Sequence, residues 1–151
     1  MVAGLIQNFT NFHPVLNPVP SRKHILIAED DPDIGNLIQF HLQRRGFRTT
    51  ALVDGREVLE CMFDLIPHLL ILDLMLPNLH GFEICRLARS VPKLSKIPIV
   101  VLTALASDEN RSKGLRMGAS AYLTKPFVTS ELMGHVERQL GLRGNLPPVM
   151  A

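Results

Sequence analysis

The sequence predicts an α/β protein in which helices cover both faces of one parallel sheet. Short apolar or half-polar runs alternate five times with segments of helical periodicity. Three of the runs are apolar throughout, as strands that are buried on both faces of a parallel sheet must be. Because the crossovers between parallel strands are right-handed, the helices form two layers with the sheet between them.

Five strands are expected from these runs. The continuous apolar runs are residues 25–28, 68–72 and 97–102. A half-polar run over 47–52 and a short run over 121–124 complete the set. Each is followed by a segment whose apolar residues recur at the spacing of one helix face, which gives a (βα)5 arrangement.

Capping residues indicate where the helices begin and end. Asp31-Pro32 supplies an N-cap and a proline at the first helical position, and Gly46 ends that helix. The later helices are expected to begin at residues that favour helix starts: Asp54, Gly81, Ser107 or Asp108, and Thr129 or Ser130.

Composition indicates one globular domain with flanking segments. The chain has 151 residues, of which 46% are hydrophobic, and a net charge of +2. We expect a flexible N-terminal arm over 1–22, the domain over 23–141, and a C-terminal tail or linker start over 142–151. The small charge gives no electrostatic case for nucleic acid or for an anionic membrane, and no apolar run reaches the length of a membrane span.

Cysteine usage favours a reducing compartment. Cys61 and Cys85 both fall on apolar helical faces, so we expect two reduced core thiols rather than a disulfide. A cytoplasmic location fits this expectation, and the broken apolar stretches of the N-terminus do not form a secretory signal.

Polar residues follow four of the expected strands and point to a site. Glu29 and Asp30 follow the first strand, Asp73 the third, Thr103 the fourth and Lys125 the fifth. Ligands of open parallel sheets bind beyond the carboxyl ends of the strands, so these side chains are expected to converge. Three carboxylates without histidine or cysteine suit Mg²⁺, and such a metal usually serves a phosphate. An aspartate can itself be the nucleophile that forms an aspartyl-phosphate.

Four segments resemble the receiver domain of bacterial two-component response regulators. They are ILIAEDDPDI (25–34), LLILDLMLPNLHG (69–81), IPIVVLTA (97–104) and AYLTKPF (121–127). The resemblance covers about residues 23–141. It implies the three-layer, doubly wound, flavodoxin-like fold with strand order 2-1-3-4-5.

The resemblance also implies roles at the metal and acceptor positions. Asp73 would be the phospho-acceptor, fed by the phosphohistidine of a histidine kinase or phosphotransfer protein. Asp30 would bind Mg²⁺ directly, Glu29 would help through water, and the backbone carbonyl of Met75 would be a further ligand. Mn²⁺ could substitute for Mg²⁺.

Further implied roles concern switching. Thr103 would bond the phosphoryl group and move towards it, and Lys125 would form an ion pair with it. The Lys125–Pro126 bond is usually cis in this family. Tyr122 occupies the position of an aromatic side chain that swings inward when Thr103 moves. The surface of the last two helices would then change its affinity for a downstream protein.

Departures from the family pattern limit the expected assembly. Positions just before the switch aromatic are often acidic in the winged-helix branch and form a charged dimer face. Here they are Ser120 and Ala121, although Arg111 and Lys113 remain available, so we expect a monomer or a weak phosphorylation-dependent dimer. His80 stands where an acid is common and is interpreted as an exposed loop histidine.

The implied activity is slow self-phosphorylation and autodephosphorylation rather than metabolic catalysis. In the family, the residues two past the acceptor and two past the threonine influence dephosphorylation. Here these are Met75 and Leu105, and their apolar side chains lead us to expect a long-lived phosphoryl form.

Three other interpretations stay open. The chain could be the receiver portion of a larger hybrid kinase or transcription factor, or a degenerate receiver that serves as a scaffold. It could also be a flavodoxin-like flavin carrier. That last class needs a loop rich in Ser, Thr and Gly after the first strand, where this chain has Glu29-Asp30-Asp31.

Overall fold

The computed structural model describes residues 22–142, and strands alternate with helices along this part. The expected flexible arm lies outside the described residues except for Arg22, and the expected tail lies outside them except for Leu142. The strands are β1 (His24–Ala28), β2 (Arg48–Leu52), β3 (Leu69–Leu72), β4 (Ile99–Thr103) and β5 (Ala121–Thr124). The helices are α2 (Pro32–Arg44), α3 (Gly55–Leu65), α4 (Gly81–Ser90), α5 (Asp108–Arg116) and α6 (Thr129–Gln139).

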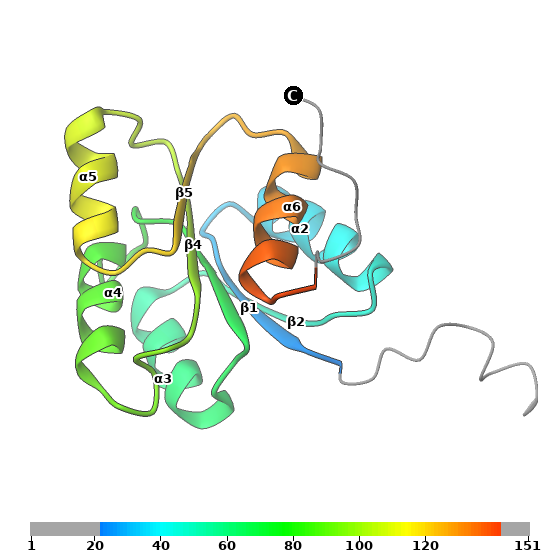
Figure 1. The fold of residues 1–151 in the computed structure, drawn as a ribbon, viewed down its shortest axis with the longest axis horizontal. Coiled ribbons are helices and arrows are strands. Elements are labelled where there is room, and N and C mark those ends of the chain that lie inside the picture. Colours follow the sequence, from blue (N-terminus) through cyan, green and yellow to red (C-terminus); the bar gives the residue numbers. More distant parts are fainter. Residues whose placement is uncertain (1–21, 143–151) are drawn as a thin grey trace, which may run out of the picture.

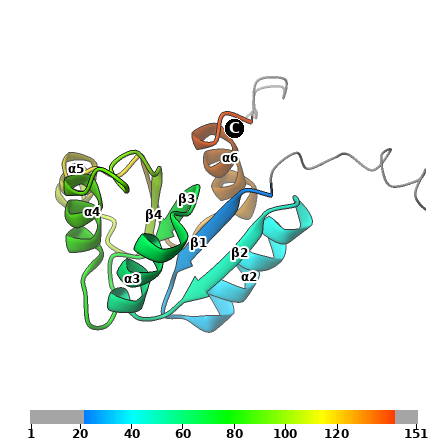
Figure 2. The same cartoon turned by 90° about the horizontal axis from the view of Figure 1, so that it is seen from below.

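The strands form one parallel sheet in the order β2-β1-β3-β4-β5. Helices α2 and α6 lie on one face, and α3, α4 and α5 lie on the other (Figures 1 and 2). The predicted doubly wound (βα)5 fold, with its strand order, is therefore confirmed.

Alternate strand residues supply two separate cores. On one face, Leu26 and Ala28 of β1 belong to the cluster that α3 and α4 cover, with Val58 and Met62 from α3. On the other face, Ile25 and its neighbours pack against α2 and α6; the helix residues of this second cluster are Ile38, Leu42, Leu132, Met133 and Val136. Every residue of β3 and β4 is buried, as their continuous apolar sequence predicts.

Most predicted helix starts are confirmed by their caps. The Asp31 carboxylate accepts a hydrogen bond from the Asp33 amide at 2.9 Å, and Pro32 is the first helical residue. The prediction that Thr129 or Ser130 caps the last helix is wrong. Val128 holds the extended backbone of the N-cap position and offers no side-chain bond, so the helix already begins at Thr129.

The fourth strand is shorter than predicted. Ile97 lies before it, and its amide donates to the Leu94 carbonyl in the preceding turn. Pro98 has no amide hydrogen to give to a ladder, and the strand begins at Ile99.

Both cysteines are free, as expected. Cys85 is buried in α4 and Cys61 is half-buried in α3. Within residues 22–142, none of the helices is long and apolar enough to cross a membrane.

Candidate functional site

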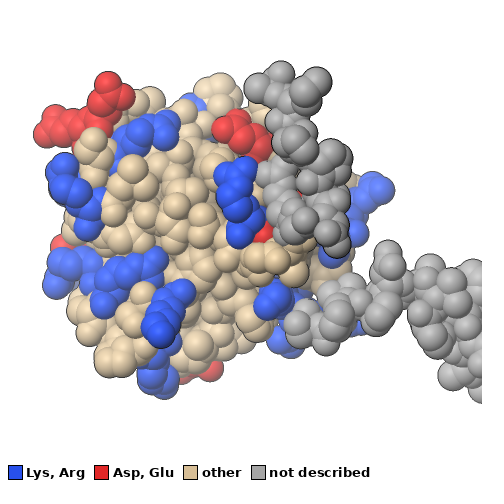
Figure 3. Space-filling model, in the orientation of Figure 1, with Lys and Arg blue, Asp and Glu red and all other residues tan. Residues whose placement is uncertain are grey.

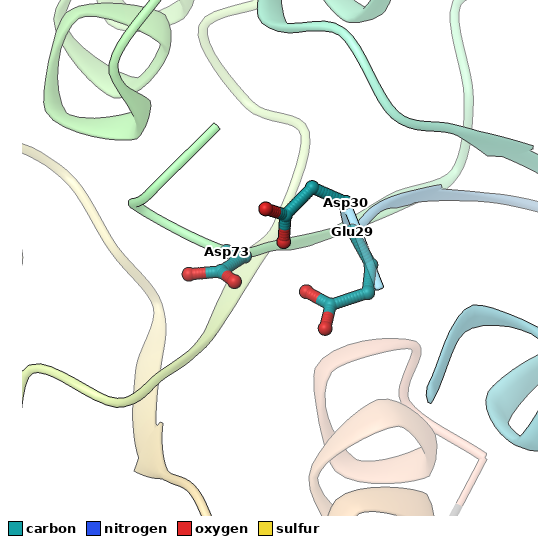
Figure 4. A group of neighbouring side chains, drawn as sticks. All are labelled: Glu29, Asp30 and Asp73. Atoms are coloured by element: carbon teal, nitrogen blue, oxygen red, sulfur yellow. The ribbon is translucent and has the colours of Figure 1, made fainter. Parts of the chain in front are cut away.

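Three carboxylates meet where β1 and β3 end. Glu29 and Asp30 directly follow β1, Asp73 directly follows β3, and the two strands are neighbours with Ala28 paired to Leu72. One oxygen of each carboxylate lies within 4.8 Å of one from each of the others. Figure 4 shows the three side chains facing a common space. The sequence expectation that these acids converge is thereby met.

The cluster is buried at its base and open at its mouth. Glu29 is 5% exposed and Asp73 4% exposed, whereas Asp30 is an exposed residue. Strand burial explains this arrangement, because Glu29 and Asp73 each follow a run of four buried strand residues by one position. A ligand can therefore reach the carboxylates from the side of Asp30.

Lys125 joins two of these acids. Its Nζ donates to Oε1 of Glu29 at 2.6 Å and to Oδ2 of Asp73 at 2.9 Å. Lys125 directly follows β5 at the far side of the sheet, and its peptide bond to Pro126 is cis, as the family resemblance implies. The ammonium compensates the charge of two carboxylates that would otherwise repel each other.

The electrostatic environment differs between the two acids. Burial raises the pKa of Glu29 to about 7, against the opposing effect of the Lys125 ammonium. Burial acts on Asp73 in the same direction, but hydrogen bonds from Lys125 and from the Met75 amide outweigh it and lower the pKa of Asp73. The pKa of Lys125 is raised, because its two acidic partners outweigh its burial. Asp73 is thus held as a carboxylate.

The donor set fits a hard divalent cation. Three carboxylates gather at one point, and the group includes neither histidine nor cysteine. Oxygen ligands from few residues, with water completing the shell, are what Mg²⁺ accepts. Met75 lies beside this group, since its amide donates to Oδ1 of Asp73 at 3.0 Å.

Thr103 lies at the same edge but bonds within its own loop. It is the last residue of β4 and is fully buried. Its hydroxyl oxygen accepts from the Leu105 amide at 3.4 Å. Thr103 therefore ends the strand next to β3, which leads to Asp73, and its hydroxyl is hydrogen-bonded to the β4–α5 loop.

Tyr122 is turned inward under that loop. The residue is 6% exposed, and its hydroxyl donates to the Leu105 carbonyl at 2.6 Å. The Arg111 guanidinium lies 5.3 Å from the ring centre and also donates to the Tyr122 carbonyl at 3.1 Å. Leu105 therefore bonds Thr103 through its amide and Tyr122 through its carbonyl.

Sequence reasoning did not find the residue that makes room for Tyr122. A Cβ placed on Gly114 of α5 would lie 2.8 Å from both Cδ2 and Cε2 of the ring. Side-chain contacts at that distance are too close, so the inward ring needs glycine here. The available signal was that Gly114 lies inside a predicted helix, since a glycine at such a position often allows another group to pack closely.

The surface over α4 and α5 carries many positive side chains, although the first turn of α5 is acidic, with Asp108 and Glu109. Figure 3 shows Lys and Arg side chains gathered over the region where α4 and α5 lie in Figure 1. Arg111 and Lys113 are exposed as expected, but each also lies over a ring, Tyr122 and Phe82 respectively. His80 is exposed, as interpreted, and its Nδ1 also accepts from the Phe82 amide as the cap of α4.

Comparison with known proteins identifies the family. The family model for the response regulator receiver domain matches residues 25–137. The phosphate regulon transcriptional regulatory protein PhoB of Rhizobium meliloti is 38% identical over 116 residues, which are 77% of this chain and 51% of that protein. The DNA-binding response regulator MtrA of Mycolicibacterium smegmatis is 36% identical over 129 residues, 85% of this chain and 55% of that one. The chain thus spans about half the length of these curated relatives.

Solved structures agree with this assignment. The receiver domain of the Francisella response regulator 1452 has a TM-score of 0.74 at 32% identity, covering 79% of this chain and 97% of that one. The receiver domain of sensor histidine kinase PA1611 from Pseudomonas aeruginosa, solved with magnesium in its active site cleft, has a TM-score of 0.73 at 30% identity, covering 80% and 99%. The chain belongs to the response regulator receiver domain family, the phosphoryl-accepting domains of bacterial two-component systems.

Proposed function

We propose that Asp73 accepts a phosphoryl group from the phosphohistidine of a histidine kinase or phosphotransfer protein. The observation that carries this proposal is the Lys125 ammonium between Asp73 and Glu29, beside the exposed Asp30. It leaves Asp73 ionised, buried and next to a positive charge. Those are the conditions that a carboxylate nucleophile needs.

In the proposed transfer, a carboxylate oxygen of Asp73 attacks phosphorus and the phosphorus–nitrogen bond of the donor breaks. The electron pair of that bond stays on the imidazole nitrogen, which takes up a proton. Lys125 already donates to Oδ2 of Asp73 and would form an ion pair with an oxygen of the phosphoryl group once that group is transferred. Phosphoryl transfer needs mainly such positioning and charge compensation.

We assign Mg²⁺ binding to Glu29, Asp30, Asp73 and the backbone carbonyl of Met75. When bound, the metal supplies positive charge to the transferring phosphoryl oxygens. Glu29 is also bonded to Lys125, which favours a water-mediated role for it, and the exposed Asp30 favours direct coordination. Mn²⁺ prefers similar oxygen ligands and is proposed to substitute.

The switch is proposed to run through Thr103 and Tyr122. A phosphoryl group on Asp73 would offer the Thr103 hydroxyl a stronger, charged acceptor than its present loop partner. Movement of Thr103 would release the Leu105 amide and so alter the loop that holds the Tyr122 hydroxyl. The partner surface is the one formed by α5, β5 and α6, and the chain would act as a cytoplasmic signalling module.

The test is incubation with acetyl phosphate, or with beryllium fluoride, in the presence of Mg²⁺. We expect one adduct by intact mass with acetyl phosphate, and none in Asp73→Asn. The environment of Tyr122, the only tyrosine in a chain without tryptophan, should change in parallel. An undiminished adduct in Asp73→Asn would reject the assignment of the acceptor.

A second candidate is that this receiver is one portion of a larger regulator. The curated relatives PhoB and MtrA are about twice as long as the region they share with this chain. Detection of the native protein in its own cells with an antibody against the receiver would decide this by apparent mass. The acidic strand end at Glu29 disfavours the flavin carrier, because it would repel a flavin phosphate.

A further inference from the structure

The loop that follows Asp73 is held by the beginning of α3. This loop, residues 74–80, carries Met75 and turns at Pro77-Asn78, where Asn78 has a φ of +70°. Leu74 and Leu76 are buried, but Met75 is 54% exposed and Asn78 is exposed. Leu79 is half-buried against the core, so it is the exposed Met75 and Asn78 that depend on polar and backbone contacts for their position.

One contact is between side chains. Asp54 is the N-cap of α3, and its Oδ1 accepts from the amides of Arg56 and Glu57 at 2.8 and 3.3 Å. Its other oxygen, Oδ2, accepts from the side-chain amide of Asn78. A single carboxylate thus caps α3 with one oxygen and holds the loop with the other.

The second contact is between backbones. The Gly55 amide donates to the Pro77 carbonyl at 2.9 Å. A Cβ on Gly55 would lie 2.1 Å from the Leu79 carbonyl oxygen, a distance that no side chain could occupy. The start of α3 and the loop therefore touch through main chain, and only glycine permits it.

The far end of the loop is held in the same way by α4. The Gly81 amide donates to the Leu74 carbonyl at 2.8 Å, and a Cβ on Gly81 would lie 2.6 Å from the Leu74 Cα. Met75 lies between these two attachments, and its own amide is bonded to Asp73. Displacing the outer loop would therefore displace the peptide unit on which the Met75 carbonyl stands.

We propose that Asp54, Gly55 and Asn78 are positioning residues for the metal site. They would hold the loop so that the Met75 carbonyl is available to a cation at the acidic cluster. The inference rests on the proposed function, since it concerns the metal of that site. Residues that orient metal ligands from outside the first coordination sphere commonly change metal affinity by about ten- to a hundredfold when replaced.

The side-chain contact is tested by a double-mutant cycle of Asp54→Ser and Asn78→Gly. Serine retains an N-cap oxygen, and glycine tolerates the positive φ, so each change removes the contact between the two side chains and little else. We expect each variant to bind Mg²⁺ about tenfold more weakly by calorimetric titration. The double variant should be no weaker than either single one, because they remove the same bond.

The backbone contact is tested by Gly55→Ala against Gly35→Ala. Both glycines lie in helices and are buried, but a Cβ on Gly35 would meet nothing within 4 Å. We expect Gly55→Ala to shift the amide resonance of Met75 in the metal-free protein and to weaken Mg²⁺ binding by more than tenfold. Gly35→Ala should leave both unchanged.

The outcomes separate this inference from the proposed function. Wild-type protein that binds neither Mg²⁺ nor beryllium fluoride rejects the proposed function itself. Wild-type protein that binds both, with folded Asp54→Ser and Asn78→Gly variants of wild-type Mg²⁺ affinity, overturns the positioning role. A loss of thermal stability without a change in Mg²⁺ affinity also overturns it, since the contacts would then be structural only. If Gly55→Ala does not fold, the Mg²⁺ affinities of Asp54→Ser, Asn78→Gly and the double variant decide whether the positioning role holds.

Discussion

Replacing Lys125 by methionine should strengthen metal binding while abolishing efficient phosphoryl acceptance. The substitution keeps an unbranched apolar side chain and removes the ammonium that lies 2.6 Å from Glu29 and 2.9 Å from Asp73. The carboxylates then lose the internal cation that holds them together. An added divalent ion no longer has to approach a positive charge.

Two effects of the substitution can be estimated: a loss of stability in the metal-free protein and a gain in Mg²⁺ affinity. Oxygens of Glu29 and Asp73 lie within 4.8 Å of each other, and two unit charges at that limit repel by roughly 3–4 kcal/mol at an effective dielectric constant of about 20. Water entry on the open side of the site reduces this, so we expect the metal-free variant to lose about 2–4 kcal/mol of unfolding free energy. The cation would lie on the exposed side of the site, beside Asp30, where the medium is close to water. There, an ammonium about 4–5 Å from a divalent ion costs about 1.5–2 kcal/mol. Its removal should tighten Mg²⁺ binding roughly ten- to thirtyfold.

The assay pairs calorimetric Mg²⁺ titration with thermal melting, at about pH 8.5 so that carboxylates are ionised. Mg²⁺ should raise the melting temperature of Lys125→Met more than that of wild type. Phosphorylation by acetyl phosphate should fall, since the ion pair with the phosphoryl group is gone. The exposed Lys93→Met is the matched control and should change none of these quantities. Unchanged or weaker Mg²⁺ binding in Lys125→Met would refute the electrostatic reasoning.

Three further predictions concern other parts of the domain. Gly114→Ala should push the Tyr122 ring outward, because its Cβ would lie 2.8 Å from ring carbons, and iodide should then quench tyrosine fluorescence more strongly. Met75→Asn should shorten the half-life of the aspartyl-phosphate, because a polar side chain can orient the attacking water. The half-life is measured as the loss of the phosphorylated mass with time. Equal half-lives in the variant and in wild type would contradict the idea that Met75 shields the phosphoryl group from water. Burial, with the nearby Arg48 and His68, lowers the pKa of His24, so the stability that its neutral form contributes is lost as pH falls below about 6.5. His24→Gln should flatten the fall in melting temperature over that range, and an unchanged slope would count against it.

The strands and the strand-end acids could be predicted because they depend on local patterns, whereas the strand order followed from the resemblance to receiver domains. Continuous apolar runs marked β1, β3 and β4, and any polar residue directly after such a run must stand at the sheet edge. Glu29, Asp73 and Thr103 were found in this way. The cap of α2 was also readable, since Asp31-Pro32 combines two helix-start signals.

The features that could not be predicted depend on contacts between distant segments. The start of α6 was misplaced because Thr129 is a good cap in isolation, whereas the extended N-cap residue is Val128 and Thr129 is already helical. Arg89 gives a second example, since its guanidinium donates to the carbonyl of Gly118, between α5 and β5, and to that of Ile97, before β4. A single arginine in a helix gives no sequence signal for such partners.

Leu105 connects the residue proposed to respond to phosphorylation, Thr103, with the residue proposed to change the partner surface, Tyr122. Its amide donates a long hydrogen bond of 3.4 Å to the Thr103 hydroxyl, and its carbonyl accepts a short one of 2.6 Å from the Tyr122 hydroxyl. The weaker of the two bonds is thus the one that a phosphoryl group on Asp73 would replace. A switch built this way can move Thr103 at small cost while Tyr122 stays bonded to the loop. The inward Tyr122 packs against Gly114, so a movement of the β4–α5 loop would change the contact between Tyr122 and α5.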